Sequence, residues 1–408
     1  MSMSQKRYLT RSWIIRGFVI LFSITLLSTI GIIHFHHNQP KIQATPTSPT
    51  ITLPGELSVT FPTQGQSAVG TDHFGVIASS PDQSSVPIAS VTKIMTAYLI
   101  LKAHPLQAGD VGPTFTMTAQ EVREYLEDEA QDYSVLKVGE GETLTERQLL
   151  EALMLPSADN IATFLARWDA GSEDAFVEKM NKAAQALGMT QTHYADASGV
   201  SSSTVSSAAD QIKIAQTAMK DPIFREIVAM PEANFTVAGL VYNVNNLLGT
   251  HGVVGIKTGN TMAAGGCFVS ATPVNVGTET HYIIGVVLGQ ETLRNALDAN
   301  AELLDEVRSA FKLYPVPTSP NGFGQVINAW NSNSSLYSAE PVQIFGYPGM
   351  TADVSISLSE QELPISRDEN IATLKIKSGQ YVQEFPLRNS EQINPPSVVW
   401  RFFRNWLS

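Results

Sequence analysis

The stretch VPIASVTKIMTAYLI, residues Val86 to Ile100, decides how the fold and chemistry of this chain are interpreted. It places Ser90 and Lys93 three residues apart, where a loop passes into an apolar run with helical spacing. Two side chains at that spacing share one face of a helix. Either Ser90 is a nucleophile with Lys93 as its base, or Ser90 is a helix N-cap and Lys93 an ordinary surface lysine.

Two further short motifs follow in the same chain and favour the nucleophile. They are SADN, from Ser157 to Asn160, and KTG, from Lys257 to Gly259 in a β-rich run. Serine becomes a useful nucleophile only when a neighbour takes its proton, so Lys93 has to be neutral. Burial and a second cation such as Lys257 favour the neutral amine, and the positive end of a helix that begins at Ser90 favours a developing alkoxide.

The remaining motif residues each have a chemical purpose in acyl transfer. Thr258 supplies a hydroxyl for a substrate carboxylate, and Gly259 lets the substrate approach the strand backbone. The backbone amides of Asn260 and Ser90 are candidates for an oxyanion hole. Ser157 is placed to relay protons between the two lysines and the leaving amine.

A second set of the same letters tests how specific this pattern is. It consists of Ser309 with Lys312, then Ser319 and Asn321, then KSG from residue 377. Ser309 lies near the end of a predicted helix, where the helix dipole opposes an alkoxide. Asn321 lies in a proline-rich linker, and KSG is typical of a turn. The structural context therefore excludes this second set as a catalytic site.

The composition of the whole chain narrows the possible functions. The chain has 408 residues, of which 43% are hydrophobic and 16% charged, so it is globular and long enough for two or three domains. Its net charge of −12 argues against nucleic acid as a partner. With Cys267 as its only cysteine, the chain forms no internal disulfide, and we expect no cofactor and no metal. The minor alternative is a metal site at His34, His36 and His37.

The N-terminal segment predicts a membrane anchor. The uncharged run from Gly17 to Ile33 would span about 25 Å as a helix. Basic residues before it predict a cytoplasmic N-terminus and a catalytic part outside the membrane, hence a single-pass protein of the cell membrane. A cleaved signal peptide is the alternative, although no A-x-A-like site follows the run. The basic residues are Lys6, Arg7, Arg11 and Arg16.

Changes in the pattern of apolar and polar residues divide the chain into segments and predict an α+β fold. Helical patterns, then short β-rich runs, then a helix indicate a mixed α/β catalytic domain whose antiparallel sheet is covered by helices. Alternating residues beyond it indicate a small C-terminal all-β domain. The apolar face of the tail would lie on a membrane or pack on the β-domain. The predicted segments are an anchor (1–37), a Pro/Thr-rich linker (38–66), the catalytic domain (67–315), the β-domain (316–392) and an amphipathic tail (393–408).

Four stretches carry a resemblance to a known family. The chain resembles the serine-type D-alanyl-D-alanine carboxypeptidases of peptidase family S11, which are low-molecular-mass penicillin-binding proteins, over about Ser67 to Pro315 and more loosely in the β-domain. The resemblance implies a β-lactamase/DD-peptidase-like fold and an acyl-enzyme on Ser90. It also implies peptidoglycan stem peptides ending in D-Ala-D-Ala as substrate and β-lactams as covalent inhibitors. The stretches are PIASVTKIMTAYLIL, LTERQLLEALMLPSADNIATFLA, THYADASGVSSSTVSSAADQIKIA and VNNLLGTHGVVGIKTGNTMAAGGC.

One departure from the family's pattern bears on mechanism. The family usually has asparagine two residues after the second serine, where this chain has Asp159 followed by Asn160. Either Asp159 is held elsewhere and Asn160 takes its place, or a carboxylate lies beside Lys93 and favours its ammonium form.

Three alternative functions remain open at this point. A D,D-endopeptidase would use the same chemistry on a larger substrate. A β-lactamase shares the three motifs, but no E-x-x-L-N-like segment follows SADN to position a hydrolytic water. A non-enzymatic scaffold at the cell wall draws support only from Asp159.

Overall fold

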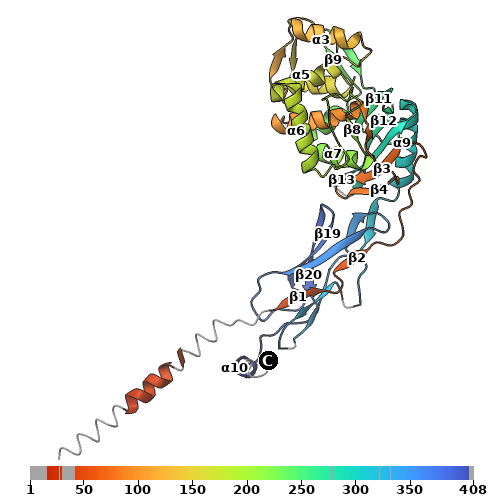
Figure 1. Cartoon of the computed structure of the whole chain (residues 1–408). Coiled ribbons are helices and arrows are strands. Elements are labelled where there is room, and N and C mark those ends of the chain that lie inside the picture. The colour runs from red at the N-terminus through yellow and green to blue at the C-terminus, as the bar shows by residue number, and fades with distance from the viewer. Residues whose placement is uncertain are drawn as a thin grey trace, which may run out of the picture.

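The computed structural model describes residues 16–26, 28–29, 42–276, 279–320, 322–330 and 332–403. Figure 1 shows a helix-rich part built around a sheet, and an elongated part made of strands. The first has a core shared by helices and sheet, and the second has a core of its own around Val326, Leu336, Leu374 and Leu387. This is the α+β architecture expected from the sequence.

A five-stranded antiparallel sheet forms the base of the helix-rich part. Along β13, Ile284 and Val286 face the core that contains α7 (Ala208–Ala218), whereas Ile283 and Val287 face the core that contains α9 (Leu293–Arg308). Because alternate residues of a strand point to opposite faces, the two helices cover opposite sides of the sheet. In spatial order the strands are β11 (Gly255–Thr261), β12 (Gly265–Val276), β13 (Glu279–Gln290), β3 (Gln66–Thr71) and β4 (Gly75–Ser79).

The helices on the α7 side surround α2 (Lys93–Ala103), which begins directly after the Ser90 turn. Most of α2 is buried, which agrees with its nearly continuous apolar sequence. A helix enclosed in this way holds the residues at its start in fixed positions.

The other helices are α3 (Ala119–Glu129), α4 (Glu146–Met154), α5 (Asp159–Ala170), α6 (Glu173–Ala186) and α8 (Pro222–Val228). Four short strands accompany them as two pairs: β5 (Val86–Pro87) with β8 (Val205–Ser206), and β6 (Thr114–Thr116) with β7 (Thr143–Thr145). A hairpin of β9 (Glu232–Phe235) and β10 (Gly239–Tyr242) follows α8.

The β-domain is built on a seven-stranded antiparallel sheet. Some strands of this sheet come before the catalytic part in the sequence and the others come after it. The strand β14 (Lys312–Pro315) leads into it and pairs with β17 (Gln343–Gly346). In spatial order the sheet consists of β1 (Gln43–Pro46), β15 (Gly324–Ile327), β16 (Ser334–Tyr337), β20 (Tyr381–Asn389), β19 (Asn370–Ser378), β18 (Thr351–Leu358) and β2 (Thr50–Thr52).

The segment predicted as a Pro/Thr-rich linker, 38–66, differs from that expectation in its described part. Here β1 pairs with β15 and β2 pairs with β18, so both form edges of the β-domain sheet. Edge strands tolerate proline and need little apolar surface, which is why no apolar period marks them in the sequence. The segment is therefore anchored to the β-domain.

The N-terminal prediction has to be corrected. Within the ranges that the structure describes, no helix is long and apolar enough to cross a membrane, so the single-pass membrane location predicted from Gly17–Ile33 is wrong. Residues 16–26 and 28–29 of that region are helical. The rest of the run lies outside the described residues, as do His34, His36 and His37.

The C-terminal helix α10 (Val398–Phe403) contacts the β-domain. The Trp400 ring meets the Trp330 ring edge to face, with 5.8 Å between centroids. The indole nitrogen of Trp330 also donates a hydrogen bond to the Asn394 carbonyl oxygen, at 2.9 Å. The described contacts of the tail are therefore those of packing on the β-domain.

The buried carboxyl group of Glu146 gives a first testable prediction. Glu146 is 1% exposed, and its Oε1 has no hydrogen-bond partner among the described residues. Burial raises the pKa of Glu146 from 4.5 to about 7. The folded state then binds the proton more tightly than the unfolded state, so this group lowers stability as the pH rises from about 4.5 through 7. We expect Glu146→Gln to stabilise the protein by roughly 2 kcal/mol more at pH 8 than at pH 5.

Urea unfolding at the two pH values measures this difference. The control is Glu178→Gln, because Glu178 is an exposed helical residue whose ion pair with Lys182, at 3.6 Å, is also exposed. The control should change stability equally at both pH values. An equal effect of Glu146→Gln at both would contradict the prediction.

Candidate active site

Ser90 lies in a tight turn that leads directly into α2. The turn is a 3-10 helix, Ala89–Thr92, and Ala89 has a φ of +49°, a region that non-glycine residues rarely occupy. The Thr92 hydroxyl donates to the Ala89 carbonyl at 2.7 Å. A Cβ on Gly199 would lie 1.9 Å from the same carbonyl oxygen, so only glycine fits beside the turn. These contacts hold a strained backbone and fix the position of Ser90.

Lys93 is fully buried, and its ammonium group makes three hydrogen bonds. Its Nζ donates to Ser90 Oγ at 2.8 Å, to Asp159 Oδ1 at 2.6 Å and to the Ser198 carbonyl oxygen at 2.8 Å. An ammonium group has three donors and no acceptor, so all of its bonding capacity is used. The structure therefore holds Lys93 in contact with Ser90 as part of a buried ion pair.

Asp159 and Asn160, the first two residues of α5, have different partners. The second carboxylate oxygen of Asp159 accepts from the Ser134 backbone amide at 3.2 Å. The Asn160 side chain accepts from the Leu136 amide and donates to the Leu136 carbonyl, both at 3.0 Å. Asp159 therefore faces Lys93, whereas Asn160 fixes the neighbouring loop.

Ser157 has an uncommitted hydroxyl just before α5. Its φ is +70°, and its Oγ is buried with no hydrogen-bond partner among the residues described. Strained backbone and unpaired buried polar atoms are typical of functional sites.

Strand β11 brings the third motif against the Ser90 turn. A Cβ on Gly259 would lie 2.9 Å from the Ile88 carbonyl and 3.1 Å from the Ser90 amide nitrogen, so glycine permits this close approach. Lys257 and Thr258 are buried, whereas Asn260 is exposed. The Lys257 ammonium donates to the Thr258 carbonyl at 3.1 Å.

The electrostatics of Lys257 follow from its surroundings. Burial, and after it the positive charge of Lys93, lower the pKa of Lys257 well below its usual value, while Asp159 partly opposes this. A buried lysine with one backbone acceptor has unused capacity for an anionic partner. A substrate carboxylate would supply that partner.

Sequence reasoning included the loop around Ser198 in the family resemblance but missed that this loop supplies the third acceptor for Lys93. Asp196 organises this loop: its Oδ2 accepts from the Ser198 hydroxyl at 2.9 Å and from the backbone amides of Gly199 and Val200 at 2.9 and 2.8 Å. The resulting turn aims the Ser198 carbonyl at Lys93. The letters DASG are typical of such an aspartate-centred turn and were the available signal.

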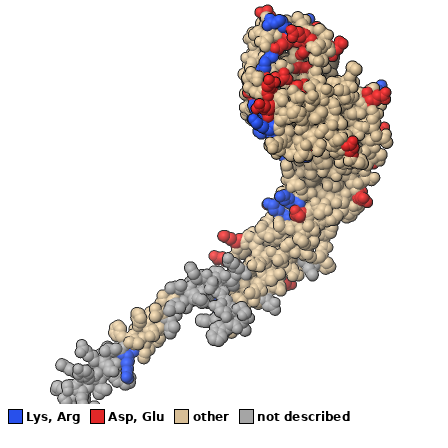
Figure 2. Space-filling view, viewed as in Figure 1, with Lys and Arg blue, Asp and Glu red and all other residues tan. Residues whose placement is uncertain are grey.

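The acidic end of α3 borders the same site. Burial, and after it the charge of Asp159, raise the pKa of Asp128 from 3.8 to about 6. Figure 2 shows acidic side chains gathered on this helix-rich part of the molecule. The carboxylate of Asp159 therefore interacts electrostatically with two groups, Lys93 and Asp128.

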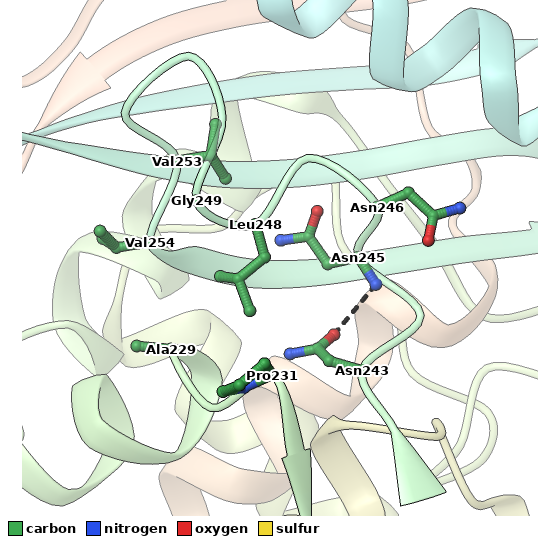
Figure 3. Close-up of a pocket in the computed structure, with 9 residues that line it drawn as sticks. All are labelled: Ala229, Pro231, Asn243, Asn245, Asn246, Leu248, Gly249, Val253 and Val254. Atoms are coloured by element: carbon green, nitrogen blue, oxygen red, sulfur yellow. Dashed lines mark hydrogen bonds between the residues drawn. The ribbon is translucent and has the colours of Figure 1, made fainter.

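A separate cavity of about 450 Å³ lies beside the segment that leads into β11 (Figure 3). None of the motif residues lines it. Its polar lining includes Asn243, whose Oδ1 accepts from the Asn245 amide at 3.0 Å. The lining residues are Ala229, Pro231, Asn243, Asn245, Asn246, Leu248, Gly249, Val253 and Val254.

Comparisons with known proteins agree with the resemblance found in the sequence. The family model for D-alanyl-D-alanine carboxypeptidases, peptidase S11, matches residues 64–292. A D-alanyl-D-alanine endopeptidase of Pseudomonas aeruginosa is 32% identical over 199 residues, which are 47% of this chain and 60% of that protein. A D-alanyl-D-alanine carboxypeptidase of Mycobacterium tuberculosis is 33% identical over 217 residues, 52% of this chain and 70% of that protein.

The fold has counterparts among solved structures. The crystal structure of a peptidoglycan synthesis regulatory factor from Streptococcus pneumoniae superposes with a TM-score of 0.60 at 21% identity. The match covers 83% of this chain and all of that one, so it includes strands of the β-domain as well as the catalytic part. The predicted DD-peptidase-like fold is confirmed.

The contact between Lys93 and Asp159 gives a second testable prediction. A carboxylate beside the base favours the ammonium form, so Asp159→Asn should free Lys93 to accept the Ser90 proton. We expect acylation of Ser90 by a fluorescent penicillin to become about tenfold faster at neutral pH. The measurement is the second-order acylation rate constant between pH 5 and 9.

Asp169→Asn is the matched control, because Asp169 is a second buried carboxylate of α5 that pairs with Lys179, another lysine. It should leave the acylation rate unchanged. Slower acylation in Asp159→Asn would show that the carboxylate assists the base.

Proposed function

The chain belongs to the D-alanyl-D-alanine carboxypeptidase family, peptidase S11, and we propose that it removes the terminal D-alanine from peptidoglycan stem peptides ending in D-Ala-D-Ala. The observation that carries this proposal is the 2.8 Å hydrogen bond between Lys93 Nζ and Ser90 Oγ, at a site flanked by a second buried lysine. It joins a nucleophile to its base within hydrogen-bond reach.

Acylation proceeds by attack of Ser90 Oγ on the carbonyl carbon between the two D-alanines. The bond from Oγ to that carbon forms, and the bond from the carbon to the nitrogen of the last residue breaks. Lys93 takes the proton of Ser90 and passes it to the Ser157 hydroxyl, which in the same step gives its own proton to the leaving amine. The amides of Ser90 and Asn260 stabilise the negative oxygen of the tetrahedral intermediate. Water then hydrolyses the ester and regenerates Ser90.

The third motif binds the end of the substrate. Lys257 supplies a positive charge and Thr258 a hydroxyl for the terminal carboxylate. Because the lysine is buried, water screens this attraction little. An anion at this position also favours the charged form of Lys257, so substrate binding and lysine protonation support each other.

The state of Lys93 sets the reactivity of this chain. Lys93 has to lose a proton before it accepts one from Ser90, and Asp159 at 2.6 Å opposes that loss. A chain with asparagine at this position would lack that opposition. We therefore propose a slower acylation at neutral pH than an asparagine at residue 159 would allow, with β-lactams acylating the same serine.

The activity is tested by the release of D-alanine from a peptide ending in D-Ala-D-Ala, using the full chain. We expect Ser90→Ala to lower the rate at least about 10³-fold, because the nucleophile is lost. Ser309→Ala is the matched control, since Ser309 and Lys312 repeat the same spacing at the end of α9. It should leave the rate unchanged.

Different failures point to different activities. No release of D-alanine, combined with cleavage of crosslinked peptide dimers, would indicate a D,D-endopeptidase, the activity named for the Pseudomonas aeruginosa relative. Rapid hydrolysis of a β-lactam would indicate a β-lactamase. Absence of all three activities would leave a scaffold role at the cell wall.

A further inference from the structure

Three side chains that the proposed reaction does not use meet at the junction of the catalytic part and the β-domain. Asp72 and His73 lie in the turn between β3 and β4, and His281 lies on β13. Their candidate ligand atoms all lie within 4.8 Å of one another. Figure 1 shows β3, β4 and β13 beside the end of β19, and the backbone amide of Gln380 in the β19–β20 turn donates to the His73 carbonyl at 3.1 Å.

The cluster contains polar atoms that are buried and unpaired. Asp72 is 8% exposed and His281 is 2% exposed. Asp72 Oδ1 and both ring nitrogens of His281 have no hydrogen-bond partner within the described ranges. The nearest charged contacts are 3.5 Å long, between Asp72 and His73 and between His281 and Glu279, which is beyond ordinary hydrogen-bond length. Since buried polar atoms are nearly always satisfied, these atoms require a partner.

Aromatic rings of the β-domain fix how His281 is oriented. The Phe345 ring on β17 stacks on the imidazole with 4.0 Å between centroids and 8° between planes. The Tyr381 ring on β20 meets it edge to face at 5.6 Å. The stacked face is therefore closed to any ligand, and binding has to take place at the ring edge, through a nitrogen.

The donor set matches one class of ligand. Two imidazoles and one carboxylate are preferred by Zn²⁺, whereas Mg²⁺ and Ca²⁺ prefer oxygen atoms alone. In a tetrahedral zinc site the ligand atoms stand about 3.4 Å apart. The widest separation in the cluster, at most 4.8 Å, therefore has to shorten by up to about 1.4 Å. His73 is 37% exposed on a turn, which gives its side chain room to move. Glu279, at the edge of the cluster, or a water molecule completes four ligands.

We propose that Asp72, His73 and His281 bind one Zn²⁺ ion at this junction. The ion would satisfy the unpaired oxygen of Asp72 and one nitrogen of His281, and it would bind the β3–β4 turn to β13 beneath Phe345 and Tyr381. Because both rings belong to the β-domain, the site would strengthen the contact between the two parts of the chain.

The test measures Zn²⁺ bound by the full chain after chelator treatment and dialysis. His34, His36 and His37 are replaced by asparagine in every sample, so that they do not bind the ion themselves. We expect one equivalent of Zn²⁺ and a raised unfolding temperature. His281→Phe, which keeps an aromatic ring against Phe345, and the exposed substitution His73→Gln should each weaken Zn²⁺ binding at least tenfold.

The matched control is His251→Asn. His251 contacts the carboxylate of Asp305 at 2.8 Å on the surface, and within the described part of the chain it belongs to no cluster of three candidate metal ligands. The control should leave Zn²⁺ binding unchanged. Failure of the parent to bind at about 10 μM Zn²⁺, or unchanged binding in both His281→Phe and His73→Gln, would overturn the proposal. The measurement uses no peptide substrate, so its outcome is independent of the proposed carboxypeptidase activity.

Discussion

The buried ammonium group of Lys93 is the interaction on which the catalytic part depends. Its three acceptors come from three places: the Ser90 turn, the first residue of α5 and the loop that contains Ser198. A lysine charge without water around it costs a great deal of free energy unless every donor is matched. The three segments therefore have to assemble together, and the position of Ser90 is fixed by the same contacts that make the burial of Lys93 tolerable.

Close approach of backbones is the second constraint. Gly199 and Gly259 both lie against the Ser90 turn, and a side chain at either would collide with backbone atoms of that turn or of the residue before it. This explains why the turn keeps its positive φ at Ala89. The sheet positions Gly259 through β11, and the aspartate-centred loop positions Gly199. Helix, sheet and loop are thus connected through one short turn.

The sequence predicted the family and the α+β fold because those conclusions rest on local patterns, three motifs each in a distinctive context. It left the roles of Asp159 and Asn160 open, since the choice depends on where α5 begins and how it is rotated. The acceptor at Ser198 is a backbone carbonyl oxygen, which every residue has, so the residue type at this position does not reveal it. The edge strands β1 and β2, and the meeting of His73 with His281, depend on pairing between distant segments, which periodicity does not reveal. The membrane prediction rested on an apolar run, the basic residues before it and the lack of a cleavage site after it, and the structure contradicts it.

Because of β1 and β2, the β-domain is formed by two parts of the chain that are far apart in the sequence. These two strands belong to the β-domain sheet but precede the catalytic part in the sequence, whereas the other five strands of that sheet, β15, β16, β18, β19 and β20, follow it. The catalytic part is therefore an insertion within a discontinuous domain. A pull applied before Gln43 and after Asn389 would be resisted by the ladders of the seven-stranded sheet. The Ser90 turn would lie outside the path of that force, so a pull on these two positions would separate an edge strand from the sheet before it disturbed Ser90.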